Sequence, residues 1–511
     1  METEDALKAS KVALGSIHLT LQNVTSTAIG VFGIAYLARA ITQEQMGILA
    51  AITFISSLIQ LANNFGLPAS LSKYISELKG RGQDISAHFI SAFAFKLPLA
   101  TALCTGLFVF SKNVSSILFG TTAHYNLIGL AALDAFALSF SPLFNSLLLG
   151  TGHLKRIAAC KILNSTSRWL FIILLLWSGY GLYGAILGWI TGDLVLLVSF
   201  AVSSIRLVKF NTNLLKESRK LIPSLLKFSW PLFAASAVTY LYTWYDRALV
   251  LAFLPLTNLG IYNTTFQAFT VLVGLATALG SSLFPYYGMA YGRNDHEAIT
   301  AGIKRASRYT AMIMFPLTLG LFATAKPVIT LFAGQQYEPG WTVLAVLSAF
   351  GLTYGILPAL SNLLLIYGKT KIVLLLSFIP IISSLALMPL LSILGLNALA
   401  LMRGTSLALT LLLTMHFLSK IVKIEIDKQA FTKTLAASAT MAATVLAAQQ
   451  VYYNKLLLPA YVLIGVIVYV AAMRLLKVPN KSDINLIGQI LGEKPAKIIA
   501  KLLGCSEQTS E

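Results

Sequence analysis

The sequence is dominated by apolar segments that are long enough to cross a lipid bilayer. A spanning helix needs about 20 predominantly apolar residues, and about fourteen such segments follow one another along the 511 residues. Hydrophobic residues make up 57% of the chain, charged residues make up 11%, and the mean hydropathy is +0.76. Because a bilayer admits only backbone whose polar groups are satisfied internally, we predict an all-α polytopic membrane protein.

The fourteen predicted transmembrane helices are separated by short connections, with one longer polar stretch after the sixth. The first is among the least certain because it contains His18, Gln22 and Asn23, and the thirteenth because it is short and rich in Ala and Thr. The predicted spans are approximately 14–38, 46–66, 86–110, 123–149, 157–179, 182–205, 228–253, 259–284, 306–332, 342–367, 372–394, 396–419, 433–450 and 456–475.

The distribution of positive charge predicts the orientation. The chain has 38 Lys and Arg against 19 Asp and Glu, a net charge of +19. If the N-terminus is cytoplasmic, thirty of these cations fall on cytoplasmic segments, and the external loops hold four: Arg39, Lys112, Lys326 and Lys455. This bias follows the positive-inside rule. We predict a multi-pass protein of the cell membrane with both termini cytoplasmic, whose basic surface faces anionic lipid and not nucleic acid.

Two halves of the sequence share a pattern. Residues 142–152 read PLFNSLLLGTG and residues 358–368 read PALSNLLLIYG, at an offset of 216. Gly181-Leu182 matches Gly395-Leu396 at an offset of 214. Short Leu-rich strings also align by chance, but the shared order and spacing favour a true repeat. Six helices is an even number, so both lobes insert the same way up as a parallel repeat.

The repeat predicts five parts of the chain. They are a six-helix lobe at 1–205, a cytoplasmic basic linker at 206–227, a second six-helix lobe at 228–420, two C-terminal helices at 421–476 and a cytoplasmic tail at 477–511. In the tail, apolar residues such as Ile484, Ile487 and Leu491 alternate with lysines at helical spacing. This pattern predicts an amphipathic helix on anionic membrane lipid, and a flexible solvated tail is the alternative.

Two short strings carry a resemblance to a known family. The seventh span contains Tyr245-Asp246-Arg247-Ala248-Leu249-Val250, followed by Leu259-Gly260-Ile261-Tyr262. The first lobe has Leu37-Ala38-Arg39 before Gln45-Met46-Gly47-Ile48. This arrangement resembles the polysaccharide and oligosaccharide-lipid flippase branch of the multidrug/oligosaccharidyl-lipid/polysaccharide (MOP) exporter superfamily. The resemblance implies alternating access of two lobes and a polyprenyl-diphosphate-linked oligosaccharide as substrate.

We place seven charged residues in the bilayer interior, where an unpaired charge costs at least about 2.5 kcal/mol. Cations suit a diphosphate, and Arg offers it a planar fork of donors. We therefore predict a substrate-binding set of Arg168, Arg403, Arg247 and Lys96. The acids Asp134, Asp193 and Asp246 are candidates for coupling transport to H⁺ or Na⁺. For each charge, an ion pair that only holds helices together is the alternative.

Other functions have less support in the sequence. The six histidines show no ligand spacing, so we predict no metal site, and no nucleotide-binding or nucleophile-elbow motif indicates a cofactor or an enzyme. A membrane glycosyltransferase or polymerase is disfavoured because the outer loops contain only Glu44 and Glu338 as acids. A cation-coupled multidrug exporter of the same superfamily stays as the alternative, although the acid usual in the first span is missing here.

Overall fold

The computed structural model describes residues 2–209, 212–281, 283–480 and 483. All regular structure in these residues is helical, which confirms the predicted all-α class. The chain divides into two compact units, Met1–Thr264 and Thr265–Glu511, and each is described by itself.

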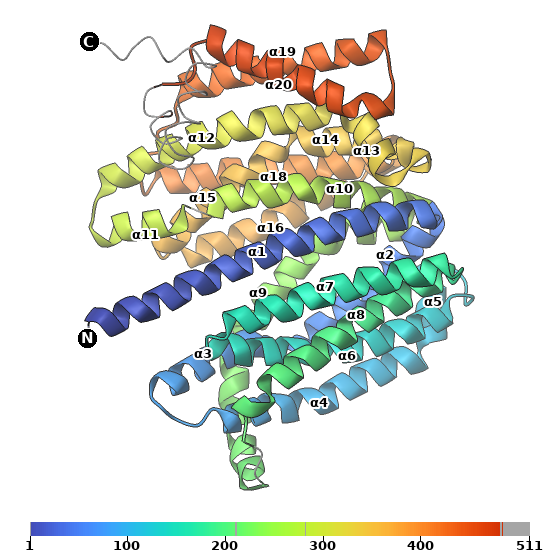
Figure 1. The fold of residues 1–511 in the computed structure, drawn as a ribbon, viewed down its shortest axis with the longest axis vertical. Coiled ribbons are helices and arrows are strands. Elements are labelled where there is room, and N and C mark those ends of the chain that lie inside the picture. The colour runs from blue at the N-terminus through green and yellow to red at the C-terminus, as the bar shows by residue number, and fades with distance from the viewer. Residues whose placement is uncertain (1, 210–211, 282, 481–482, 484–511) are drawn as a thin grey trace. The chain divides into compact units, whose positions relative to one another are not determined.

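The described residues of the first unit form nine α-helices and the beginning of a tenth. In this unit α6 packs on α2, α3, α4 and α8, and α7 packs on α1 and α8 (Figure 1). The bounds are α1 Glu2–Ala40, α2 Gln43–Asn64, α3 Leu67–Gly80, α4 Ser86–Val109, α5 Ser111–Phe119, α6 Tyr125–Gly150, α7 Leu154–Trp177, α8 Gly181–Ser204, the 3₁₀ turn η1 Ile205–Leu207, α9 Thr212–Phe253 and α10 Leu256–Ser281.

The second unit contains the end of α10 and the helices that follow it. Here α18 packs on α14, α15 and α16, and α19 packs on α12 and α20. The bounds are α11 Phe284–Gly292, α12 His296–Ala323, α13 Ala325–Ala333, η2 Gln335–Gly340, α14 Trp341–Ala349, α15 Gly351–Ile366, α16 Thr370–Ala386, α17 Leu390–Leu394, α18 Leu396–Ser419, α19 Lys428–Val451, η3 Lys455–Leu457 and α20 Leu458–Leu475.

The predicted spans correspond to helical elements of the structure. Twelve helical segments of the described chain are long and apolar enough to cross a membrane, including the two weakest predictions at His18–Ala40 and Lys428–Val451. The pair α12 and α13 forms a further candidate that bends by 73° at its break, and α16 is an apolar helix of 17 residues. The predicted total of about fourteen is therefore approximate, because two spans are bent or short.

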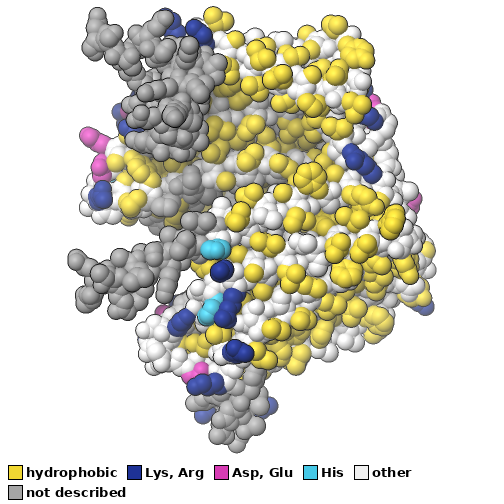
Figure 2. Space-filling view, in the orientation of Figure 1, with side chains coloured by type: hydrophobic (Ala, Val, Ile, Leu, Met, Phe, Trp, Pro, Cys, Tyr) yellow, Lys and Arg dark blue, Asp and Glu magenta, His cyan; other side chains and the backbone are white. Residues whose placement is uncertain are grey.

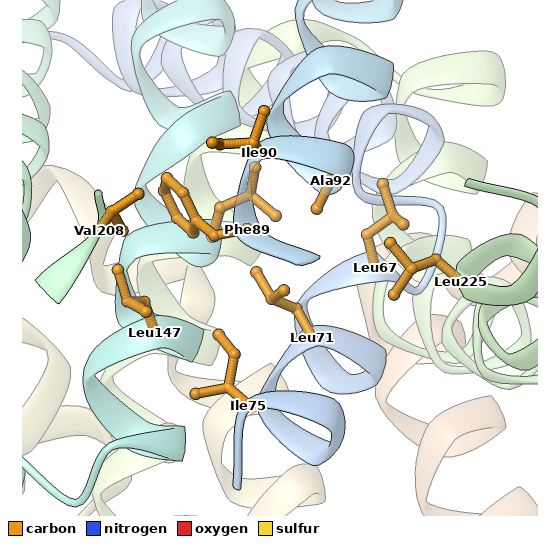
Figure 3. Close-up of a cluster of buried hydrophobic side chains, with 10 residues drawn as sticks. Leu67, Leu71, Ile75, Phe89, Ile90, Ala92, Leu147, Val208 and Leu225 are labelled. Carbon is orange, nitrogen blue, oxygen red and sulfur yellow. The ribbon is translucent and has the colours of Figure 1, made fainter. Parts of the chain in front are cut away.

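The segment predicted as a basic linker differs from the prediction in its local structure. Helix α9 begins at Thr212 and runs for 42 residues to Phe253, so most of 206–227 is helix continuous with the seventh span. The reason lies in its composition, because Leu, Lys, Glu and Arg are strong helix formers. Leu225 in this segment is buried and joins a cluster with Leu71 of α3 and Phe89 of α4 (Figure 3). The predicted lobe boundaries themselves stay a prediction.

The sequence repeat is matched by a repeat in local structure. Pro142 lies inside α6 and Pro358 inside α15. After each helix a glycine takes a positive φ, 77° at Gly152 and 68° at Gly368. The hydrogen bonds around these turns correspond: the N–H of residue 153 donates to O of 148, and the N–H of 369 donates to O of 364, both at 2.8 Å. A left-handed residue after a helix favours glycine, which explains why both strings end in Gly.

The outer faces of several helices are apolar. On α8, Leu194, Val198 and Val202 recur every four residues and are 43%, 58% and 67% exposed. Figure 2 shows hydrophobic side chains over much of the visible helix surfaces, with charged side chains mostly near helix ends. A contiguous exposed apolar face on spanning-length helices is typical of contact with lipid.

Arg308 on α12 joins three chain segments of the second unit. Its Nη1 donates to Asp427 Oδ2 at 2.7 Å, and its Nη2 donates to Asp483 Oδ2 at 2.7 Å and to the Val478 carbonyl at 2.6 Å. Burial would raise the pKa of Asp427, but the Ala430 N–H and the Arg308 guanidinium outweigh this effect and hold that pKa below its ordinary value. The start of the C-terminal segment is therefore tied to α12.

Two glycines of the family-like strings bring α2 and α10 into backbone contact. A Cβ on Gly260 would lie 1.9 Å from the carbonyl oxygen of Gln43 and 3.0 Å from the nitrogen of Gly47. A Cβ on Gly47 would lie 2.0 Å from the carbonyl oxygen of Leu256. Small residues allow helices in a membrane to approach this closely. This contact gives the glycine of each string a structural role.

We expect Gly260→Ala to destabilise the protein, because the clash is with backbone that cannot rotate away. Overpacking of this kind costs roughly 1–3 kcal/mol. The measurement is the melting temperature of the detergent-solubilised protein, followed by fluorescence-detected size exclusion. Gly274→Ala is the matched control on α10, since no described atom lies within 4 Å of its Cβ position. Equal melting temperatures for the two variants would contradict the proposed contact.

Candidate functional site

The seven charged residues predicted inside the bilayer lie within helices, and the structure brings only some of them together. Three meet between α6, α7 and α8, two lie on α9, one lies on α4, and one lies on α18 in the second unit. In that order they are Asp134, Arg168 and Asp193; Asp246 and Arg247; Lys96; and Arg403.

Arg168 and Asp193 form an ion pair between α7 and α8. The Arg168 Nη2 donates to Asp193 Oδ1. The same oxygen accepts from Asn164 Nδ2 at 3.2 Å. The Asp193 side chain is fully buried, the Arg168 side chain is 22% exposed, and its guanidinium lies 4.9 Å from the centre of the Trp189 ring. Arg168 therefore has an acid partner 25 residues away on the neighbouring helix.

A row of glycines on α8 makes this pairing possible. Gly184, Gly188 and Gly192 are spaced by four residues and lie on one face of the helix. A Cβ on Gly188 would lie 2.6 Å from Ile172, and a Cβ on Gly192 would lie 2.4 Å from the Cβ of Arg168. Because α7 and α8 can approach so closely, the Arg168 side chain reaches the carboxylate that follows Gly192.

Asp134 approaches the ion pair from α6. It lies against α8, with Trp189 and Ile190 in the same cavity wall, and it interacts electrostatically with Asp193 and Arg168. On the other side, Asp134 lines a small cavity of about 50 Å³ against α2. The polar residues of α2 in this cavity are Thr53, Ser56, Ser57 and Gln60. We call Asp134, Arg168 and Asp193 the acid–arginine cluster.

Asp246 and Arg247 join α9 to α10. The Tyr262 hydroxyl donates to Asp246 Oδ2 at 2.7 Å, and Arg247 Nε donates to Asn263 Oδ1 at 3.0 Å. Arg247 Nη1 lies 3.4 Å from Asp246 Oδ1, so the adjacent residues also form an ion pair. Asp246, Arg247 and Tyr262 are all buried. The Asp-Arg string and the Leu-Gly-x-Tyr string are thus bonded to each other.

We expect Tyr262→Phe to lower the melting temperature, because it removes one donor from a buried carboxylate. The Arg247 donors to Asp246 Oδ1 remain, and the loss of one hydrogen bond to a buried carboxylate costs about 1–3 kcal/mol. The control is Tyr180→Phe, since Tyr180 is 58% exposed at the start of α8. The two variants are compared by thermal unfolding in the same detergent. A Tyr262→Phe protein as stable as the control would show that this hydrogen bond contributes little.

The side chain of Lys96, on α4, reaches the break between α2 and α3. Its side chain is fully buried, and Nζ donates to Asn64 Oδ1 at 2.6 Å. Helix α2 ends at Asn64, and Phe65 and Gly66 follow with φ values of 44° and 70°. The carbonyl end of a helix carries partial negative charge. The position of the ammonium at the end of α2 is therefore favourable.

Arg403 is the candidate cation of the second unit. It is 4% exposed, its Nε donates to the Tyr354 hydroxyl at 3.2 Å, and its guanidinium lies 4.5 Å from the centre of the Phe266 ring. A hydroxyl and an aromatic face both orient a guanidinium. These contacts hold the side chain of Arg403 in one direction.

The aromatic residues of the seventh span pack partly on α2. The Tyr240 hydroxyl donates to the carbonyl oxygen of Phe54 at 3.0 Å, and the rings of Trp244 and Phe54 are 5.7 Å apart. For these two residues the structure indicates a packing role.

The neutral polar partners of the buried charges lie outside the predicted site residues. Asn164 binds Asp193, Asn64 binds Lys96, Tyr262 binds Asp246 and Tyr354 binds Arg403. One signal was available, because an amide side chain inside a spanning segment also needs a partner. The spacing Gly184-x-x-x-Gly188-x-x-x-Gly192 was a second signal, since it marks a close helix contact.

Comparison with known proteins identifies the family. The family model described as "Polysaccharide biosynthesis protein" matches residues 36–341, more than half of the chain. The chain belongs to this family. The resemblance predicted from the Asp-Arg and Leu-Gly-x-Tyr strings is confirmed.

Two relatives have names that describe glycan transport. The probable low-salt glycan biosynthesis flippase Agl15 of Haloferax volcanii is 24% identical over 338 residues, which cover 66% of this chain and 68% of that protein. The succinoglycan biosynthesis transport protein ExoT of Rhizobium meliloti is 23% identical over 340 residues, which cover 65% of each chain.

Solved structures share the fold. A lipid II flippase MurJ in an inward closed conformation aligns with a TM-score of 0.74 and 17% identity, over 91% of this chain and 98% of that one. An inward-facing multidrug resistance MATE transporter of the MOP superfamily aligns with a TM-score of 0.59 and 15% identity, over 79% of this chain and 97% of that one. The fold is therefore that of a multi-pass transporter of this superfamily.

Proposed function

We propose that the protein is a secondary transporter that flips a polyprenyl-diphosphate-linked oligosaccharide from the cytoplasmic to the outer leaflet. The observation that carries this proposal is the family match over residues 36–341, together with relatives named as a glycan flippase and a succinoglycan transport protein. The lobes alternate access to the two sides, and the protein forms and breaks no covalent bond in the substrate.

The substrate's diphosphate needs positive charge along its path. Arg403 is our first candidate contact, because its hydroxyl and aromatic neighbours hold the guanidinium in one orientation, and a guanidinium presents phosphate with a planar fork of donors. Arg168, Arg247 and Lys96 are the further proposed contacts. Each would first have to loosen its present bond to Asp193, Asn263 or Asn64.

Flipping is tested with the full-length chain in proteoliposomes that contain a fluorescent polyprenyl-diphosphate oligosaccharide, whose outer-leaflet fraction is measured by chemical quenching. We expect Arg403→Gln to reduce the flipping rate at least tenfold at normal expression. Arg403→Lys should recover only part of it, because it keeps the charge and loses the planar fork. Arg474→Gln, at an exposed site near the end of α20, is the control.

Two results would contradict this assignment. Normal flipping by Arg403→Gln would remove Arg403 from the substrate path. Wild-type protein that moves a cationic dye but no lipid-linked oligosaccharide would overturn the flippase function in favour of the multidrug exporter.

The proposed orientation places both termini and the 206–227 segment in the cytoplasm. We expect a membrane-impermeant maleimide to label Lys112→Cys in intact cells and to label Arg206→Cys only after permeabilisation. Both side chains are exposed and lie in the same unit. The background lacks the three native cysteines. External labelling of Arg206→Cys would reverse the proposed topology.

A further inference from the structure

The acid–arginine cluster contains two carboxylate oxygens that accept no hydrogen bond from the described residues. They are Asp134 Oδ1 and Asp193 Oδ2. Asp134 is 7% exposed and Asp193 is fully buried, so neither carboxylate is well solvated. Buried polar atoms are nearly always satisfied in native proteins. The Arg168 Nε of the same cluster also has no partner among the described residues, and a proton between the neighbouring carboxyls would supply the donor that both acceptors lack.

The charges of the cluster point to the same conclusion. The charged groups that act on Asp134 are Asp193 and Arg168, and α2 contributes only the neutral residues of the cavity wall. With both acids ionised, one guanidinium would face two carboxylates and leave a net charge of −1 in the middle of three spanning helices. Such a charge is costly in a bilayer, and two adjacent carboxylates repel each other strongly. One bound proton makes the cluster neutral and supplies the missing donor.

A sodium ion fits this site less well than a proton. The Arg168 guanidinium already occupies Asp193 Oδ1, so a metal cation would lie beside a fixed positive charge. A proton needs no coordination shell and can lie between the two carboxyls. The site also has room for water next to Asp134, because a cavity of about 50 Å³ exceeds the 10–15 Å³ that one water needs.

We propose that Asp134 and Asp193 share a single proton, that Arg168 neutralises the remaining negative charge, and that this proton is exchanged through the cavity against α2 during each transport cycle. Loss of the proton leaves a negative charge that only water entering the cavity can solvate. Deprotonation therefore favours an arrangement in which α2 and α6 separate. The coupling part of this assignment rests on the proposed flippase function, whereas the shared proton does not.

The proton is measured by infrared spectroscopy of the full-length protein in nanodiscs, through the C=O band of a protonated carboxyl and its shift in D₂O. We expect wild type to show this band at neutral pH. Both Asp134→Asn and Asp193→Asn should abolish it, because the one acid that remains is then balanced by Arg168. Asp246→Asn is the matched control, a buried acid that already accepts from Tyr262, and it should keep the band.

Several outcomes would overturn the shared proton. They are absence of the band from wild type, its survival in either single variant, or its loss when sodium chloride replaces choline chloride at constant pH. The last result would assign the site to Na⁺.

Coupling is measured as stimulation of flipping by a pH gradient across the proteoliposome. We expect wild type to be stimulated several-fold and Asp134→Asn to flip at the same rate with and without the gradient. Stimulation that persists in Asp134→Asn would overturn the coupling role. Wild-type protein that keeps the infrared band but flips no lipid-linked oligosaccharide would overturn the proposed function and leave the proton site intact.

Discussion

The cost of placing charge inside a bilayer governs the interior of this protein. Apart from Asp134, each charged side chain that the sequence puts in mid-span has a hydrogen-bond partner in the structure, and the partner comes from another helix in most cases. Asp193 accepts hydrogen bonds from Arg168 and Asn164, Lys96 donates one to Asn64, and Asp246 accepts one from Tyr262. In lipid no solvent can replace such a partner. The charged residues therefore fix which helices must be neighbours.

Close backbone contacts make those partnerships geometrically possible. Glycines on α8 let α7 approach until Arg168 reaches Asp193, and Gly47 and Gly260 let α2 approach α10. Lipid tails are as apolar as leucine side chains, so helix association in a membrane depends on this close packing and not on apolar burial alone. At the Arg168–Asp193 pair, polar partner and glycine contact thus act together, since the bond lies where α7 and α8 come close.

The fold was largely predictable from sequence because spans are read from length and apolarity, which are local properties. The bends of the helices were harder to predict from sequence. The 73° break between α12 and α13 and the helical start of α9 at Thr212 depend on packing that a hydropathy window cannot contain. The candidate site was predictable in its charged members, since a charge in a span stands out. Their partners were not predictable. Arg168 and Asp193 lie 25 residues apart and meet only because α7 packs on α8.

The two sequence repeats differ at the position of the acid–arginine cluster. At the offset of 216 that aligns Pro142 with Pro358, Asp134 corresponds to Phe350, and at the offset of 214 that aligns Gly181 with Gly395, Asp193 corresponds to Leu407. In the second unit the Phe350 ring lies directly against α18, where a Cβ on Gly404 would come within 2.0 Å of it. Leu407 is buried nearby at 4% exposure.

In the second sequence repeat, Phe350 and Leu407 thus stand at the positions aligned with the two carboxyls of the first. Packed apolar contacts of this kind neither bind nor release an ion. The aligned positions of the two sequence repeats therefore differ in chemistry. If a proton drives transport through this position, it does so from the first repeat only, and each cycle moves one proton and not a symmetric pair.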